Sequence, residues 1–144
     1  MRVERTTHIA APPKDVYDVV MDPQRLRDWV TIHDRLEGSP RTPLQQGSEL
    51  TQHLKLAGRG FTVHWHVVEN SPCERVVWEG RGPFASHARV EYRFDSNDGG
   101  TDFSYVNEYD LPGGPFGRVA GRAVSRVTQK EVDGSLQRLK QLVE

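Results

Sequence analysis

Residues 61–68 read Phe61-Thr-Val-His-Trp-His-Val-Val68, and this stretch decides the fold. Successive side chains of a β-strand point to opposite faces, so its alternation of apolar and polar residues predicts a strand with one apolar face. Residues 50–56 repeat the alternation. The sequence therefore predicts a hairpin with one mainly apolar face. Its inward positions are Leu50, Gln52, Leu54, Leu56, Phe61, Val63, Trp65 and Val67, and its outer positions include His53, His64 and His66.

The turn between these strands determines which residues face each other. If Gly58 and Arg59 form a two-residue turn, every inward residue meets an inward residue. A three-residue loop would place His53 opposite Trp65 and mix the two faces, so we expect the shorter turn. The predicted pairs are Ala57 with Gly60, Leu56 with Phe61, Leu54 with Val63, Gln52 with Trp65, Leu50 with Val67, and His53 with His64.

Composition restricts the class of protein. The 144 residues suit a single domain over 1–144. With 19 Lys plus Arg against 20 Asp plus Glu, the net charge of −1 predicts no general attraction to nucleic acid. Cys73 is the only cysteine, which excludes an internal disulfide and fits a cytoplasmic protein. No apolar run approaches the ~20 residues that cross a bilayer, so we expect no stable membrane insertion.

The other elements follow from local signals. A weakly alternating strand at residues 3–9 leads into a short helix after Pro12 and Pro13, and a second short helix begins at Asp22-Pro23 and buries Trp29. Residues 31–47 form a polar connection with one short strand. Turn residues separate the remaining strands, which we expect at 48–57, 60–69, 74–81, 86–95 and 102–111.

After residue 115 the apolar period changes from 2 to 3.6, which predicts a long carboxy-terminal helix. Its apolar stripe runs through Phe116, Ala120, Ala123, Val124, Val127, Val132, Leu136, Leu139 and Val143. The order of elements is that of an α+β fold, with a curved antiparallel sheet that buries its apolar face against this helix. Because the strands are long and rich in aromatic residues, we expect a hollow between sheet and helix.

Four segments of the chain are similar to one known family. They are Ile9–Val20, the helix Asp22–Trp29, the turn and strand Asn70–Trp78, and the final hairpin with its exit, Tyr92–Phe103 and Glu108–Pro115. In order and spacing they resemble the START-related, helix-grip superfamily (SRPBCC), which includes Bet v 1-like proteins, bacterial polyketide cyclase/dehydrase proteins and lipid-transfer proteins. The resemblance covers nearly the whole chain. It implies a helix-grip fold with an apolar cavity that accepts a hydrophobic small molecule.

We expect sixteen residues to line this cavity. The strand phases place inward polar groups at Gln52, Tyr92, Tyr105, Asn107 and Tyr109, and ligand pockets commonly combine such groups with an apolar wall. Each tyrosine could also be a core aromatic whose hydroxyl reaches backbone or water. The expected lining is Trp29, Gln52, Leu54, Phe61, Val63, Trp65, Trp78, Val90, Tyr92, Phe103, Tyr105, Asn107, Tyr109, Phe116, Val124 and Val127.

Catalytic groups are scarce in this pattern. A cyclase would need a general acid or base near a polarised ketone. No histidine falls in the inward phase of the predicted strands. Glu131, near the inner stripe of the last helix, is the only charged candidate, and it could equally lie on the flank of that helix. No catalytic residue can be assigned, and no cofactor is indicated.

Two polar patterns lie outside the cavity. The cluster of His53, His64 and His66 could converge on a metal, but no carboxylate is placed to complete a site, so we predict a solvated face and no metal. A basic stripe repeats every four residues along the last helix. It could meet an acidic protein partner or an anionic membrane surface, or simply face solvent; its members are Arg118, Arg122, Arg126 and Lys130.

Three functions remain open from the sequence. The leading hypothesis is a carrier or sequestering protein for a hydrophobic or aromatic small molecule, lipid-like or polyketide-like. The first alternative is a polyketide cyclase or dehydratase acting in the same cavity. The second is a protein-interaction module that uses the basic stripe or the outer sheet. Fold resemblance alone does not separate them, because one fold hosts many activities.

Overall fold

A computed structural model places the central hairpin as β3 (Glu49–Leu56) and β4 (Arg59–Ser71). The structure describes residues 1–56, 58–110 and 115–144, with only the backbone course for 115–124. The inward positions of the hairpin are largely buried, whereas His64 and His66 are exposed. The predicted apolar and polar faces are therefore confirmed.

The register of this hairpin differs from the prediction by two residues. Leu56 pairs with Arg59, so the two-residue loop lies one position earlier than expected, and Gly58 within it has φ +79°. Glycine adopts that left-handed conformation without a steric cost. The expected pairs are wrong: Leu54 faces Phe61, Gln52 faces Val63, Leu50 faces Trp65, His53 faces Thr62 and His64 faces Thr51. The predicted pairs with Ala57 fall on a position outside the described residues.

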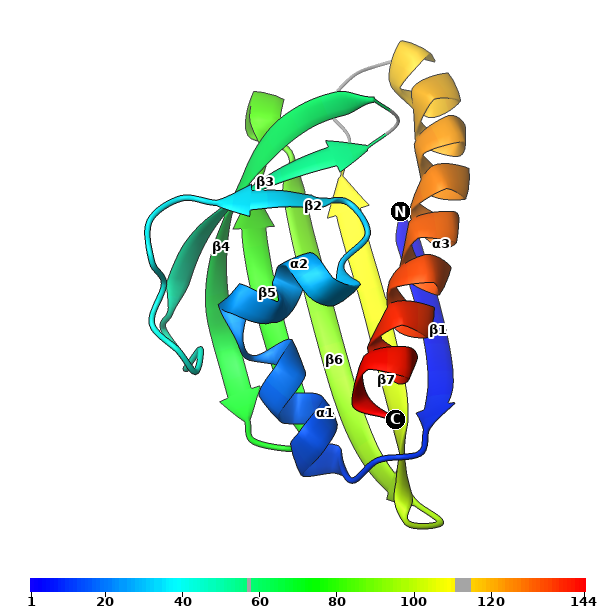
Figure 1. Cartoon of the computed structure of the whole chain (residues 1–144). Coiled ribbons are helices and arrows are strands. Elements are labelled where there is room, and N and C mark those ends of the chain that lie inside the picture. Colours follow the sequence, from blue (N-terminus) through cyan, green and yellow to red (C-terminus); the bar gives the residue numbers. More distant parts are fainter. Residues whose placement is uncertain (57, 111–114) are drawn as a thin grey trace.

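Seven strands form one antiparallel sheet in the order β1-β7-β6-β5-β4-β3-β2. Consecutive strands pair as neighbours from β2 to β7, while the first strand crosses to the far edge and pairs with the last. Figure 1 shows the sheet curling around α3. The remaining strands are β1 (Arg2–Ile9), β2 (His33–Leu36), β5 (Arg75–Arg81), β6 (His87–Asn97) and β7 (Gly100–Asp110).

Two of the turns are tighter than expected. Asp98 and Gly99, with φ +49° and +75°, make a two-residue loop between β6 and β7, where the strands expected at 86–95 and 102–111 left residues 96–101 for the turn. Positive φ at both positions matches the twist of the flanking strands. Strand β4 continues through Asn70 to Ser71, so its turn comes later and includes Cys73 at φ +61°.

The helices cover the concave side of the sheet. Asp22 accepts a hydrogen bond from the backbone N–H of Gln24 at 2.9 Å and so caps the second helical segment. In α3, Val132, Leu136 and Leu139 are buried. The helical elements are α1 (Pro13–Val20), η1 (Pro23–Arg25), α2 (Leu26–Trp29), η2 (Pro83–Ala85) and α3 (Pro115–Val143).

This arrangement is an α+β helix-grip fold, as predicted. The buried inward residues of the sheet, the short helices and α3 share one apolar core. No helix within residues 1–56, 58–110 and 115–144 is long and apolar enough to cross a membrane.

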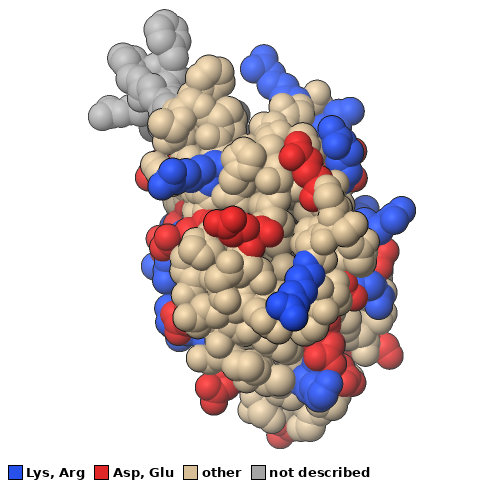
Figure 2. Space-filling view, turned by 90° about the vertical axis from the view of Figure 1, so that its left-hand side faces the viewer, with Lys and Arg blue, Asp and Glu red and all other residues tan. Residues whose placement is uncertain are grey.

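The surface carries mixed charge. Figure 2 shows Lys and Arg interspersed with Asp and Glu over one face. Of the predicted basic stripe, Arg126 and Lys130 are exposed on α3, while the side chains of Arg118 and Arg122 lie outside the described residues. A protein partner for this stripe stays a prediction.

Candidate functional site

The sheet has a hollow on each side. An inner cavity of about 630 Å³ lies between the concave face of the sheet, the α2–β2 connection and α3. An outer groove of about 1030 Å³ crosses the opposite face. The inner cavity is lined mainly by apolar and aromatic side chains, and the outer groove mainly by polar and charged ones.

Small residues at the centre of the sheet create the inner cavity. The cross-strand row Trp65–Gly80–Ala88–Tyr109 places its two smallest members on β5 and β6. A Cβ added to Gly80 would lie 2.7 Å from Cε3 of Trp65, so the indole ring lies directly over this glycine. With Val90 in the adjacent row, the central strands leave space that the flanking aromatics surround.

Edge-to-face contacts hold the aromatic wall in place. The rings of Trp65 and Trp78 are 6.0 Å apart at 69°, and those of Trp78 and Tyr92 are 5.9 Å apart at 89°. Tyr105 then contacts Tyr92 at 5.0 Å and 76°. Such geometry is the preferred one for aromatic pairs. The wall is therefore a connected frame rather than a set of independent side chains.

The hydrogen-bonding groups inside the cavity are neutral. Burial raises the pKa of Tyr92 well above its usual range, and the adjacent Tyr105 phenol adds to the shift. Burial raises the pKa of Tyr105 to about 12, although its contact with Tyr92 acts in the opposite direction. Within the described part of the chain, the buried Trp78 Nε1 and Tyr109 hydroxyl have no hydrogen-bond partner. The polar groups of the interior are thus uncharged.

Charged side chains line the cavity where it opens to solvent. Arg59, His87 and Asp110 are all exposed, and His87 pairs with Asp110 across β6 and β7. Phe84 in η2 also belongs to this mouth and is 86% exposed. Phe84 and Ala85 both adopt left-handed backbone angles, with φ of +56° and +59°. The mouth is therefore the only charged part of the described cavity lining.

The structure brings eleven of the sixteen expected residues together around the cavity. Strand alternation was the signal that found them, because all eleven lie in the inward phase of β3 to β7. They are Gln52, Leu54, Phe61, Val63, Trp65, Trp78, Val90, Tyr92, Tyr105, Asn107 and Tyr109.

The other expected residues do not line the cavity as described. Trp29 and Phe103 are fully buried on the far side of Tyr92, with ring contacts at 5.9 and 5.6 Å, so they belong to the solid core. Val127 is half-buried on α3 and not in the lining, where Thr128 takes its place. The side chains of Phe116 and Val124 lie outside the described residues.

Glu131 is not a cavity group. Its carboxylate and its backbone carbonyl both accept hydrogen bonds from the hydroxyl of Thr31, at the end of α2. Of the two positions left open for Glu131, the structure therefore favours the flank of α3. Glu131 joins α3 to the α2–β2 connection instead.

Sequence reasoning missed residues that come from connections. Leu26, Val30 and Ile32 cover the cavity from the α2–β2 region, and their apolar character was the available signal. No histidine lies in the inward phase of the predicted strands, as expected. His87 reaches the mouth from the outward phase of β6, and His33, on a short strand whose position was not predicted, bonds to Gln52.

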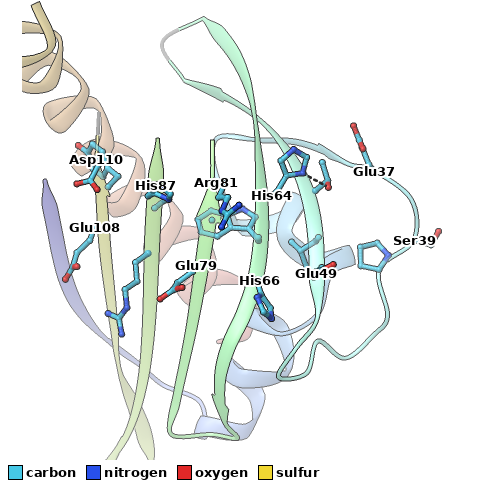
Figure 3. A pocket seen from close by; sticks show the side chains of 18 residues that line it. Glu37, Ser39, Glu49, His64, His66, Glu79, Arg81, His87, Glu108 and Asp110 are labelled. Atoms are coloured by element: carbon cyan, nitrogen blue, oxygen red, sulfur yellow. Dashed lines mark hydrogen bonds between the residues drawn. The ribbon is translucent and has the colours of Figure 1, made fainter. Parts of the chain in front are cut away.

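The predicted histidine cluster lies on the outer face. His64 and His66 line the outer groove with Glu79, Arg81 and Glu108, as Figure 3 shows. His64 Nδ1 is 3.0 Å from the Thr51 hydroxyl, whereas His53 bonds to Glu37 and Thr62 at 2.8 and 3.0 Å. The described residues contain no group of three or more His, Cys, Asp or Glu side chains arranged to hold a metal ion. The groove is a wet surface of mixed charge.

Comparison with known families gives one match over the whole length. Residues 1–144 match the sequence model of the family described as polyketide cyclase / dehydrase and lipid transport. Among curated proteins, the chain is 25% identical over 134 residues to the uncharacterized protein Rv1546 of Mycobacterium tuberculosis H37Rv. That alignment covers 90% of this chain and 92% of the relative.

Solved structures share the fold. TTHA0849 from Thermus thermophilus superposes with a TM-score of 0.81 at 20% identity, covering 99% of this chain and 97% of that one. The Zhui aromatase/cyclase from Streptomyces sp. R1128 gives a TM-score of 0.79 at 17% identity, covering 99% and 93%. At such identities the superpositions show the common architecture only.

Proposed function

This chain belongs to the polyketide cyclase/dehydrase and lipid transport family, and from that premise we propose that it binds a hydrophobic or aromatic small molecule in the inner cavity. The protein would act as a carrier or sequestering protein for a lipid-like or polyketide-like compound. The lining of the cavity is the observation that carries the proposal.

Three properties of that lining suit an apolar ligand. The volume of the cavity that it encloses, about 630 Å³, lies within the usual range for small-molecule sites. Its wall is aromatic and aliphatic, and burying such surface against a ligand is worth about 25 cal/mol per Å². Its interior polar groups are uncharged, so a neutral ligand meets no unpaired ionic group inside.

A pair of substitutions on adjacent residues tests the proposal. Ala88 faces the cavity and Arg89 the outer groove. Ala88→Trp should fill the hollow and weaken binding of the neutral fluorophore N-phenyl-1-naphthylamine by about 10-fold or more, because it replaces the ligand's space with indole. Arg89→Trp should leave binding close to that of the unaltered protein. Equal affinities for Ala88→Trp and the unaltered protein would rule out the inner cavity as the site.

Native mass spectrometry of the freshly purified protein complements this test. A co-purifying apolar compound that is lost in Ala88→Trp and kept in Arg89→Trp would identify the cargo directly. A compound retained equally by both variants would place it elsewhere on the molecule.

One observation favours an enzyme as the second candidate. His87 and Asp110 are register partners on β6 and β7 that line both the mouth and the outer groove, and imidazole and carboxylate side chains are common general acids and bases. If the cavity holds a cyclase or dehydratase, the recovered compound should lose water on incubation with the protein, and His87→Ala should stop that loss. For a carrier, Tyr105→Phe and Asn107→Leu should change affinity alone, and the compound should stay intact.

A further inference from the structure

Three side chains form a hydrogen-bonded chain from the cavity wall to the edge of the sheet. The indole Nε1 of Trp65 is 2.9 Å from Oε1 of Gln52. The amide Nε2 of Gln52 is in turn 2.9 Å from Nδ1 of His33. Trp65 and Gln52 are buried and line the cavity, whereas His33 is only half-buried on the edge strand β2.

The chemistry of the three groups fixes the direction of every bond. An indole N–H only donates, so it must meet the carbonyl oxygen of Gln52. The amide NH₂ of Gln52 then points to His33 and must donate. Nδ1 of His33 is therefore the acceptor. It follows that the folded protein holds His33 neutral, with its proton on Nε2.

We propose that His33 is a positioning residue for the cavity wall, and that its protonation releases Gln52 and Trp65 and so weakens ligand binding. Protonated His33 carries hydrogens on both ring nitrogens, so Nδ1 would face the NH₂ group of Gln52. Turning the amide over would satisfy His33 but would place NH₂ against the N–H of Trp65. No orientation of Gln52 bonds both neighbours once His33 is charged.

The surroundings of His33 also disfavour its protonated form. Burial lowers the pKa of His33, and Arg27 on α2 lowers it further, while the adjacent Asp34 partly opposes them. On β3, His33 faces the apolar Leu54 across the ladder. Of the two titratable residues that flank Leu54, His53 is bonded to Glu37, and the side chain of Lys55 is exposed. Protonation of His33 therefore gains little from its neighbours and loses the bond from Gln52.

The first test needs no ligand. In ¹⁵N-histidine-labelled protein, long-range ¹H–¹⁵N NMR correlations should show His33 as the Nε2–H tautomer with a pKa below 6.5. Gln52→Glu is the matched variant, because a carboxylate accepts from both Trp65 and a protonated His33. This variant should raise the pKa of His33 above that of the unaltered protein. An Nδ1–H tautomer, or a pKa at or above 6.5 in the unaltered protein, would overturn the assignment.

The second test measures the coupling to ligand and rests on the proposed function. Affinity for N-phenyl-1-naphthylamine should fall roughly 10-fold between pH 7.5 and pH 5.0, because one buried hydrogen bond of the wall is lost. His33→Gln offers a neutral acceptor at either pH and should remove most of that fall. His87 at the mouth is present in both proteins, so the comparison isolates the effect of His33.

The outcomes separate the two proposals. Equal loss of affinity in His33→Gln and the unaltered protein would overturn the coupling while leaving the cavity as the binding site. Absence of binding at pH 7.5, with the Nε2–H tautomer present, would overturn the proposed function and the coupling that rests on it, while upholding the hydrogen-bonded chain itself.

Discussion

Two tyrosines of this chain place their hydroxyl groups in opposite situations. The hydroxyl of Tyr17 donates to Oδ1 of Asn70 at 2.8 Å, whereas that of Tyr109 is buried and has no partner in the described part of the chain. A buried hydrogen bond contributes about 0.5–1.5 kcal/mol, and a buried unpaired polar group costs about 1–3 kcal/mol. Tyr17→Phe should therefore lower the free energy of unfolding by about 1 kcal/mol, and Tyr109→Phe should leave it unchanged or raise it.

Urea denaturation of the two variants checks this prediction, with each serving as the control for the other. A loss of about 1 kcal/mol or more in Tyr109→Phe would mean that its hydroxyl has a partner after all.

The face of the sheet on which each side chain lies was predictable. Whether that side chain lines the cavity or is buried in the core was not. Alternation placed Tyr92 and Phe103 correctly on the inward face, yet only Tyr92 lines the cavity, since the short helices bury Phe103 completely. His33 was beyond prediction for a different reason. Its contact with Gln52 depends on how a short strand within a polar connection docks on β3, and no periodicity encodes that.

At the scale of the strands, the close approach of Trp65 to β5 makes Gly80 hard to replace. A Cβ at this position would lie 2.7 Å from both Trp65 and Val63. Gly80→Ala should therefore push the indole into the cavity, lower the free energy of unfolding by about 1–3 kcal/mol and weaken ligand binding. Gly60→Ala is the control, because its Cβ would meet only the Leu54 carbonyl at an ordinary 3.8 Å.

Unfolding midpoints and near-ultraviolet circular dichroism, which reports on the packing of Trp65, measure the two effects together. If Gly80→Ala keeps the stability and the aromatic signal of the unaltered protein, the ring does not lie over Gly80 in solution.

The hairpin register shows what an apolar/polar alternation with a period of two residues can and cannot specify. A shift of the pairing by one residue would expose the apolar face, so alternation excludes it. A shift by two keeps every side chain on its face. The predicted pair of Leu54 with Val63 and the actual pair with Phe61 are therefore equivalent to any argument from hydrophobicity. The position of Gly58 in the loop decides between them.

At the scale of the whole molecule, stability should fall with acid in two steps. Hydrogen bonds from Arg75 and Arg93 lower the pKa of Glu91 from 4.5 to about 2. Since the folded state binds this proton less tightly than the unfolded state, the stabilisation is complete above pH 4.5 and is lost between pH 4.5 and 2. The lowered pKa of His33 gives an earlier, smaller loss as the pH falls below 6.5.

The stabilisation lost between pH 4.5 and 2 amounts to roughly 2 kcal/mol. It is no larger because the arginines around Glu91 are partly exposed, so solvent screens their charges. Glu91→Gln should lower the free energy of unfolding at pH 7 and flatten its dependence on pH below 4.5. Chemical denaturation at several pH values provides the measurement, with the exposed Glu79→Gln as the control. A slope below pH 4.5 that is the same in both variants would contradict the assignment to Glu91.

The pairing of β1 with β7 also sets an order of events during synthesis. Ile9 pairs with Thr101 and Arg2 with Glu108, so β1 cannot pair until β7 has left the ribosome about 100 residues later. At about 5–20 residues per second that delay is roughly 5–20 s. The hairpins from β3 to β7 can form earlier, but α3, which packs on their apolar side, is translated after all of them. Until α3 has been made, the part of the sheet that it packs on stays exposed. A chaperone or the cargo itself can therefore reach the cavity before α3 docks.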